Sequence, residues 1–351
     1  MTKKAFLSVL LFLAVFFVSF HFVSAHEVYV LNSQTIHYDV THPSPDPLSL
    51  IGEDGTRATF LVCTIVAVIL VVGVFLLSIS RWAERLLDPV LMKLKRYAPL
   101  VARLTLGISL LAAAYYKALF GPELPLTAIF GHYAVAVQVI LYVISICILF
   151  GLFVRESACV ALIIFIVAVI AYKSYMLTYV NYLGEIVMNM ILGGGLWSLD
   201  HYRNSQNPPS LILRQAKQKL EPYAFPILRI LFGLSALYAS WYAKLFHSEL
   251  ALDTVNQYHL THYFHFAPLF VVLGALIVET LIGIFFILGI EIRFTALFFL
   301  FFLTLSLCFF GEVVWPHIVL LGVNIVFIFH GYDRYSLEGR FFKKGNREPV
   351  L

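Results

Sequence analysis

The chain of 351 residues is 61% hydrophobic and 13% charged, with a formal net charge of +4 and a mean hydropathy of +0.88. Soluble domains average about 45–50% apolar and about 25% charged residues, so this composition excludes a soluble enzyme and predicts a polytopic membrane protein in the lipid bilayer. The basic residues lie in short loops rather than in one patch, which argues against a nucleic-acid partner.

The N-terminal residues 1–25 are typical of a signal peptide: two lysines, a long apolar run and small residues before a cleavage point. An uncleaved anchor is the alternative. Either way, the polar, histidine-containing segment 26–57 is expected on the exported side. Cleavage would leave His26 as the first residue, where its α-amino group and imidazole could chelate copper. An ordinary exported tail is the favoured interpretation, since no fixed ligand spacing supports a metal site.

Residues 58–80 predict the first transmembrane helix, because a span needs roughly 20 apolar residues. Residues 81–97 are basic with interleaved apolar positions, which indicates a cytoplasmic amphipathic linker. Residues 98–200 and 224–338 then contain four apolar runs each, and we name them repeat 1 and repeat 2. The stretch between the repeats, 201–223, is predicted to be a cytoplasmic linker.

The two repeats share a sequence frame. Arg103–Leu124 returns as Arg229–Leu250, with about ten of 22 paired positions identical. Arg229 lies 126 positions after Arg103, whereas Arg293 lies 138 positions after Arg155. Repeat 2 has therefore gained about 12 residues, which we assign to the loop after its first helix, the usual place for insertions.

Basic residues predict the orientation. They gather in the 81–97 linker, in the 201–223 linker and in the tail 339–351, which are separated by whole four-helix units. The positive-inside rule makes this side cytoplasmic. We therefore predict an all-α polytopic protein of the inner (cytoplasmic) membrane. It has two parallel four-helix bundles, one preceding transmembrane helix and an N-terminal signal peptide, with an exported N-terminus and a cytoplasmic C-terminus.

Glu279 is the strongest candidate for chemistry, because it lies midway along an apolar run. A charge at this depth costs roughly 2.5–3.5 kcal/mol on insertion scales, so an intramembrane acid is a functional candidate by default. Lys244, His317 and Asn324 are the nearest polar partners by depth. The alternative is a carboxyl that only joins helices by hydrogen bonds. Position 141, the counterpart in repeat 1, is Leu, so an acid site would belong to repeat 2.

The predicted external ends of the helices hold further polar and aromatic groups. One hypothesis is a vestibule that leads to Glu279 and seats a quinone or another small amphipathic ligand, with Glu312 and His317 as proton-transfer groups. The alternative is a set of interfacial anchors. The expected pocket residues are Trp241, Tyr242, Trp315, Asn324 and Glu185.

Three histidines in the inserted loop are spaced three apart: His259, His262 and His265. This spacing would place the rings on one face of a helical turn, where they are weak candidates for metal binding. A solvated or proton-responsive loop is the favoured interpretation. No Walker loop, dinucleotide-binding glycine motif or H-E-x-x-H motif is present.

Several of these positions together resemble the DoxX/DoxD superfamily of four-helix membrane proteins. The resemblance covers about residues 100–340 and would make the chain a tandem pair. It rests on short motifs: an Arg and a Gly in the first helix with a nearby Lys, the acid Glu279, and a Gly-x-x-x-Arg turn. Each repeat also closes on Ser-Leu-Asp or Ser-Leu-Glu. The arginines Arg103, Arg155, Arg229 and Arg293 are expected to be structural.

The resemblance implies a subunit of a membrane redox system, since family members include part of a thiosulfate:quinone oxidoreductase. We therefore expect quinone or proton handling at the external side of repeat 2. The catalytic groups would be Glu279, Lys244, Glu312 and His317, and the partner a membrane or exported redox protein. The alternatives are a small-molecule or metal-handling permease-like protein and a non-enzymatic assembly or structural subunit.

Overall fold

The computed structural model describes residue 31 and residues 33–79, 90–206, 211–310 and 315–342. The predicted signal peptide, His26, most of the 81–97 linker, Glu312 and most of the basic tail lie outside these ranges. Every element within them is a helix. Five helical segments are long and apolar enough to cross a membrane: Ala98–Tyr116, Leu126–Phe150, Val154–Leu192, Gln218–Phe246 and Pro268–Leu288. The chain is therefore an all-helical integral membrane protein.

Each repeat contributes four main helices. Repeat 1 has α6 (Ala98–Tyr116), α8 (Ala134–Phe150), α9 (Val154–Tyr172) and α10 (Val180–Leu192). Repeat 2 has α12 (Leu211–Trp241), α15 (Pro268–Leu288), α16 (Ile292–Phe310) and α17 (Pro316–His330). The first helix of repeat 2, α12, begins within the stretch 201–223 that was predicted as a linker. Good helix formers such as Leu, Gln, Lys and Ala at its start extend the helix beyond the apolar run.

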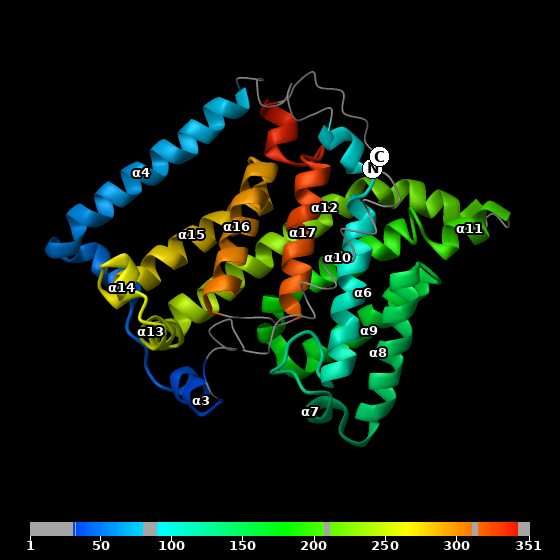
Figure 1. The fold of residues 1–351 in the computed structure, drawn as a ribbon, viewed down its shortest axis with the longest axis horizontal. Coiled ribbons are helices and arrows are strands. Elements are labelled where there is room, and N and C mark those ends of the chain that lie inside the picture. The colour runs from blue at the N-terminus through cyan, green and yellow to red at the C-terminus, as the bar shows by residue number, and fades with distance from the viewer. Residues whose placement is uncertain (1–30, 32, 80–89, 207–210, 311–314, 343–351) are drawn as a thin grey trace.

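The repeats are interlocked through their first and fourth helices. The fourth helix of repeat 1, α10, packs along α12 of repeat 2, and the fourth helix of repeat 2, α17, packs along α6 of repeat 1. These four helices occupy the middle of the molecule, with α8 and α9 on one side and α15 and α16 on the other (Figure 1). The two units thus form a single core.

Glycines at equivalent positions permit this close packing. A Cβ on Gly184 of α10 would lie 3.2 Å from the Leu228 Cα of α12. A Cβ on Gly322 of α17 would lie 2.3 Å from the Thr105 side chain of α6. Gly322 follows Gly184 by 138 positions, the spacing found at the closing motifs. Small residues let helix backbones approach in membranes, so these glycines set the distance between the repeats.

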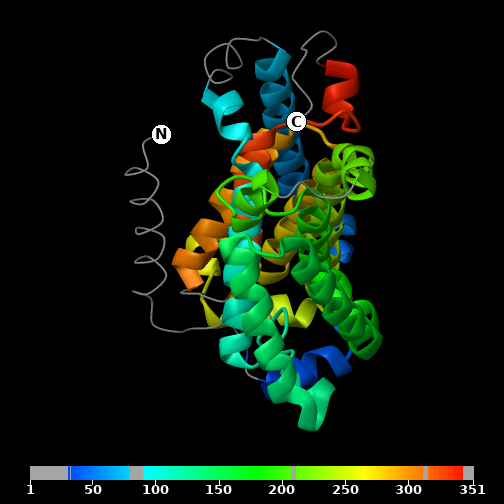
Figure 2. The ribbon, with the colours of Figure 1, turned by 90° about the vertical axis from the view of Figure 1, so that its right-hand side faces the viewer.

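The polar segment before the repeats folds against the outer end of repeat 2. We use "outer end" for the end predicted to face the exported side. Here α3 (Ser33–Thr41) packs on α13 (Ser248–Gln257), and η1 (Pro47–Gly52) packs on α15. In both views, α3 lies at the opposite end of the bundle from η5 (Glu338–Phe342), close to the chain's end (Figures 1 and 2).

The helix before repeat 1, α4 (Asp54–Ile79), covers residues 58–79 of the predicted first span. Its main packing contact is η1, and it runs along one flank of the molecule, apart from the central helices (Figure 1). Its described apolar side chains, such as Leu61, Val62 and Ile69, are exposed. A helix that is apolar on all faces is stable in this position only when lipid surrounds it.

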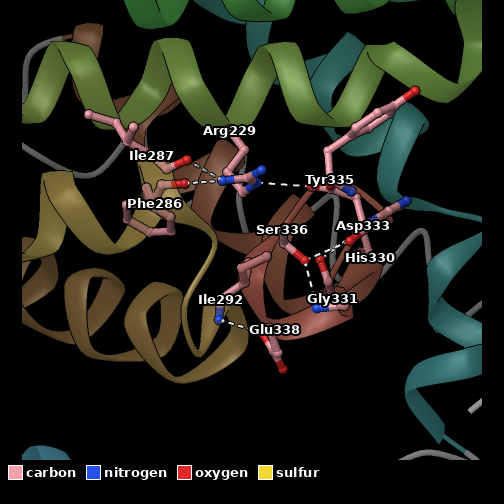
Figure 3. A network of polar contacts seen from close by, with 11 residues as sticks. Arg229, Phe286, Ile287, Ile292, His330, Gly331, Asp333, Tyr335, Ser336 and Glu338 are labelled. Carbon is pink, nitrogen blue, oxygen red and sulfur yellow. Dashed lines mark hydrogen bonds and ion pairs between the residues drawn. The ribbon is translucent and has the colours of Figure 1, made fainter. Parts of the chain in front are cut away.

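The shared motifs close the inner end of each repeat. Arg229 donates from Nε to Asp333 Oδ2 at 2.9 Å and from Nη1 to the carbonyls of Phe286 and Ile287 (Figure 3). The Glu338 carboxylate accepts from the backbone N–H of Ile292 at 3.0 Å, at the start of α16. An acid at a helix N-terminus satisfies an otherwise unpaired N–H group and the helix dipole.

Repeat 1 closes with the same motifs, although its arginine binds different carbonyls. Arg103 donates to the carbonyls of Gly194 and Trp197. The Asp200 carboxylate accepts from the N–H groups of Phe153 and Val154, both at 3.0 Å. The acid at 200 and the acid at 338 therefore cap the third helix of their own repeat. This gives a physical cause for the Ser-Leu-Asp and Ser-Leu-Glu endings.

Candidate functional site

An ion pair between two helices of repeat 2 joins Lys244 to Glu279. The Lys244 Nζ lies 3.0 Å from Glu279 Oε2, and the two side chains are 7% and 17% exposed. Lys244 belongs to η4 (Tyr242–Phe246), a π-helical turn that continues α12, and Glu279 belongs to α15. The two residues that the sequence singled out are thus direct partners.

The pair forms because α12 and α15 cross closely. A Cβ on Gly233 would lie 2.7 Å from the Gly283 carbonyl oxygen, and a Cβ on Gly283 would lie 2.9 Å from the Gly233 carbonyl oxygen. Glu279 lies one helical turn from Gly283, so the carboxylate faces the neighbouring helix at short range. The π-turn then brings Lys244 to it. Single-turn π-bulges occur frequently at functional sites.

Aromatic side chains surround the π-turn. Trp241 Nε1 donates to Thr280 Oγ1 at 3.1 Å, which joins the same two helices beside the ion pair. The Tyr242 ring packs edge-on against Tyr175 of repeat 1, with ring centroids 5.4 Å apart, and lies 4.7 Å from the His247 ring. Burial lowers the pKa of the His247 imidazole, because it disfavours the charged form of this ring at the outer edge of the site.

Repeat 1 contributes residues that the sequence did not indicate. Tyr175 and Tyr179, from η3 (Lys173–Tyr179), both donate their hydroxyls to Glu123 Oε1, Tyr175 at 3.0 Å. This Glu123 follows the first helix of repeat 1 as Glu249 follows that of repeat 2, which was the one available signal. Tyr175 contacts Tyr242, so the outer end of the site includes both repeats.

Four other residues expected at the site have different surroundings: Trp315, His317, Asn324 and Glu185. Trp315 stacks on Tyr116 of repeat 1 with ring centroids 5.0 Å apart, and its Nε1 donates to the Leu119 carbonyl. His317 and Asn324 are buried in α17, where Asn324 Nδ2 donates to the Leu320 carbonyl at 2.8 Å.

Glu185 is fully buried in repeat 1, and its Oε1 lies 2.9 Å from Thr105 Oγ1. Its hydrogen-bond partner Thr105 belongs to repeat 1, whereas Lys244 and Glu279 both belong to repeat 2. The polar groups therefore form two sites.

The histidine loop shows no assembled metal site. His259 and His262 stack with ring centroids 5.6 Å apart, and α14 (Thr261–Phe264) is only four residues long. His265 lies just after it in a left-handed conformation. Within the described ranges, no group of three or more His, Cys, Asp or Glu side chains could hold a metal ion. The copper hypothesis for His26 concerns a residue outside these ranges.

Comparison with known proteins does not assign the chain to a family. No family model, no curated protein and no solved structure matches the chain. The resemblance to DoxX/DoxD proteins therefore stays a prediction from the motifs. What the geometry itself offers is a lysine and a carboxylate at hydrogen-bonding distance inside a membrane domain, flanked by Trp and Tyr rings. Such a set can exchange protons with an apolar, planar ligand.

Proposed function

We propose that the chain is a component of a membrane redox system and handles a quinone, with its protons, at the outer end of repeat 2. The observation that carries the proposal is the Lys244–Glu279 pair. A pair of opposite charges inside an apolar helix crossing is costly to desolvate, and apolar residues of similar size often pack as stably or better. Intramembrane ionisable residues are therefore expected to serve function.

The chemistry of a quinone fits these groups. Reduction adds electrons and protons in equal number to the two ring oxygens and gives a quinol. In this proposal the Lys244 ammonium donates a hydrogen bond to a quinone oxygen, and Glu279 exchanges protons with it. Trp241 and Tyr242 provide ring surfaces for the planar head group. The electrons come from a membrane or exported redox protein that binds at the outer end.

Quinone binding to the purified protein tests this proposal. The wild-type protein in mild detergent or nanodiscs is expected to retain quinone in lipid extracts and to bind added short-chain quinone, with quenching of Trp fluorescence. Glu279→Gln removes the charge but keeps the shape, and we expect binding to weaken by roughly 10- to 100-fold, the effect of about 1.5–3 kcal/mol for a charged hydrogen bond. Glu156→Gln, an exposed acid in α9, is the matched control.

The other outcomes identify the competing functions. If wild-type protein binds no quinone, and liposomes show protein-dependent flux of a solute or metal that Glu279→Gln abolishes, the protein is a permease. If Glu279→Gln changes neither binding nor flux while a partner co-purifies, the protein is an assembly subunit. Equal quinone affinity in wild type and Glu279→Gln would contradict the role given to the pair.

A further inference from the structure

The buried face of α10 in repeat 1 carries polar groups that the site in repeat 2 does not use. These groups lie one, three and four residues apart along the chain, so they follow one side of the helix. They are Asn181, Tyr182, Glu185 and Asn189. All four are at most 3% exposed. A buried polar group costs free energy unless it is hydrogen-bonded, so such a stripe needs an explanation.

Repeat 2 shows that the fold does not require this stripe. The positions 138 residues later on α17 are Val319, Leu320, Val323 and Phe327. Val319 and Val323 are fully buried and Phe327 is 2% exposed. The same helix position in the same architecture is therefore packed with apolar side chains in one repeat and with polar ones in the other. Structural need does not account for Glu185.

The hydrogen bonds around Glu185 give an ionised carboxylate little support. Thr105 Oγ1 donates to Glu185 Oε1 at 2.9 Å and also lies 2.9 Å from the Val101 carbonyl oxygen. A threonine hydroxyl has one proton, and in a helix it commonly donates to the carbonyl four residues earlier. Glu185 therefore shares the proton of its hydrogen-bond donor with a backbone carbonyl.

An ionised Glu185 does not fit its surroundings. Its side chain is fully buried, and Oε2 has no hydrogen-bond partner. Within the described residues no ion pair involves it. An unpaired charge in an apolar interior is far more costly than a neutral carboxyl.

A set of hydroxyl groups leads from the outer end to this carboxyl. Tyr179 donates to Glu123, and its ring lies 6.2 Å from that of Tyr182. The Tyr182 hydroxyl lies 2.5 Å from Ser109 Oγ. Ser109 and Thr105 are one turn apart on α6, and Thr105 contacts Glu185. Ser109 Oγ also donates to the Trp315 carbonyl at 3.1 Å. Hydroxyl groups both donate and accept, so a proton can pass between those that come into contact.

We infer that Glu185 is a second intramembrane site of this protein, a proton-binding carboxyl in repeat 1 that exchanges with the outer end through Tyr182, Ser109 and Thr105. Its ligand is the proton. The site is independent of the quinone proposed for repeat 2, and it gives repeat 1 an ionisable group of its own.

Infrared spectroscopy of the full-length protein in lipid tests the inference. The carbonyl stretch of a protonated carboxyl is resolved from the amide bands and shifts on exchange into deuterium oxide. At neutral pH the wild-type spectrum minus the Glu185→Gln spectrum is expected to show such a band, and Glu279→Gln is expected to retain it. A missing band, or a band unchanged in Glu185→Gln, would overturn the inference.

The path is tested by the rate of deuterium exchange. Tyr182→Phe removes the hydroxyl next to Ser109, and we expect the exchange of the Glu185 band to slow by roughly fivefold, the effect of losing one net hydrogen bond. Ser145→Ala, which removes a buried hydroxyl bonded to the Tyr142 carbonyl in α8, is the matched control. Equal rates in wild type and Tyr182→Phe would overturn the path.

Stability provides a separate test of function against structure. Because Val323 fills the equivalent place in repeat 2, Glu185→Val is expected to fold with a thermal midpoint no lower than that of wild type. A large loss of stability would mean that Glu185 is structural and would contradict the inference. Failure of Glu185→Val to fold would count as such a loss of stability. The infrared spectrum of Glu185→Gln would still show whether the Glu185 carboxyl carries a proton.

Discussion

At the scale of residues, one left-handed glycine in each repeat joins the arginine and acid motifs. Gly151 and Gly289 end α8 and α15 with φ of 69° and 70°. Their N–H groups bond within the helix end, and their carbonyls accept from the backbone N–H groups of Asp200 and Glu338 at 2.8 and 3.0 Å. The arginine of each repeat lies against the same glycine. The glycine is required because both the conformation and the space exclude a side chain.

Gly151→Ala and Gly289→Ala are therefore expected to destabilise the protein to a similar extent. A Cβ would lie 2.3 Å from the Ser198 Cβ in the first case and 2.4 Å from the Ser336 Cβ in the second. Left-handed strain of about 1–2 kcal/mol adds to an overpacking cost of about 1–3 kcal/mol. Thermal unfolding in detergent measures the loss. Gly195→Ala separates the backbone strain from the overpacking, since Gly195 has φ of 60° but no atom lies within 4 Å of an added Cβ. Equal thermal unfolding midpoints for all three variants would show that the contacts with Ser198 and Ser336 add no cost.

At the scale of elements, the exported segment is bound to repeat 2 by contacts that include a buried acid. Asp39 of α3 is 1% exposed, and Oδ2 has no hydrogen-bond partner. Burial, followed by the neighbouring carboxylates of Asp253 and Glu249 in α13, raises the pKa of Asp39 from 3.8 to about 6. The Ser248 hydroxyl donates to the Pro45 carbonyl in the same region. The docking of α3 on α13 is thus coupled to a proton.

This coupling predicts that α3 docks more tightly at lower pH. The raised pKa means that the docked state favours the protonated carboxyl. Its contribution is complete below about 3.8 and is lost as the pH rises through about 6. Hydrogen exchange of the α3 amides, corrected for intrinsic rates, should show protection that falls across this range.

Asp39→Asn is the control for the docking experiment, because an amide has no titrating proton. It should keep α3 protected at all pH values. A pH dependence that persists unchanged in Asp39→Asn would assign the effect to another group and contradict the role of Asp39.

At the scale of the whole molecule, the sequence predicted an all-helical membrane protein, and this prediction is confirmed. The partnership of Lys244 with Glu279 was accessible because depth along two helices can be counted from the sequence. Depth does not give the face of a helix, which is why Trp315 and Glu185 were assigned to the wrong surroundings. Repetition identifies equivalent positions, but it does not show which copy a helix contacts. The packing of each fourth helix on the other repeat therefore needed the structure.

The interlocked core predicts that the two repeats stay together without a covalent link. A protease site inserted between Gln206 and Leu211 should allow cleavage while the halves still elute as one particle in detergent, because α10–α12 and α6–α17 are contacts between the halves. Gly184→Phe with Gly322→Phe should separate the cleaved halves, because each ring would have to displace the opposing helix. Gly274→Phe is the control, since no atom lies within 4 Å of an added Cβ there. Separation of the cleaved wild-type halves would mean that each repeat is a stable bundle by itself.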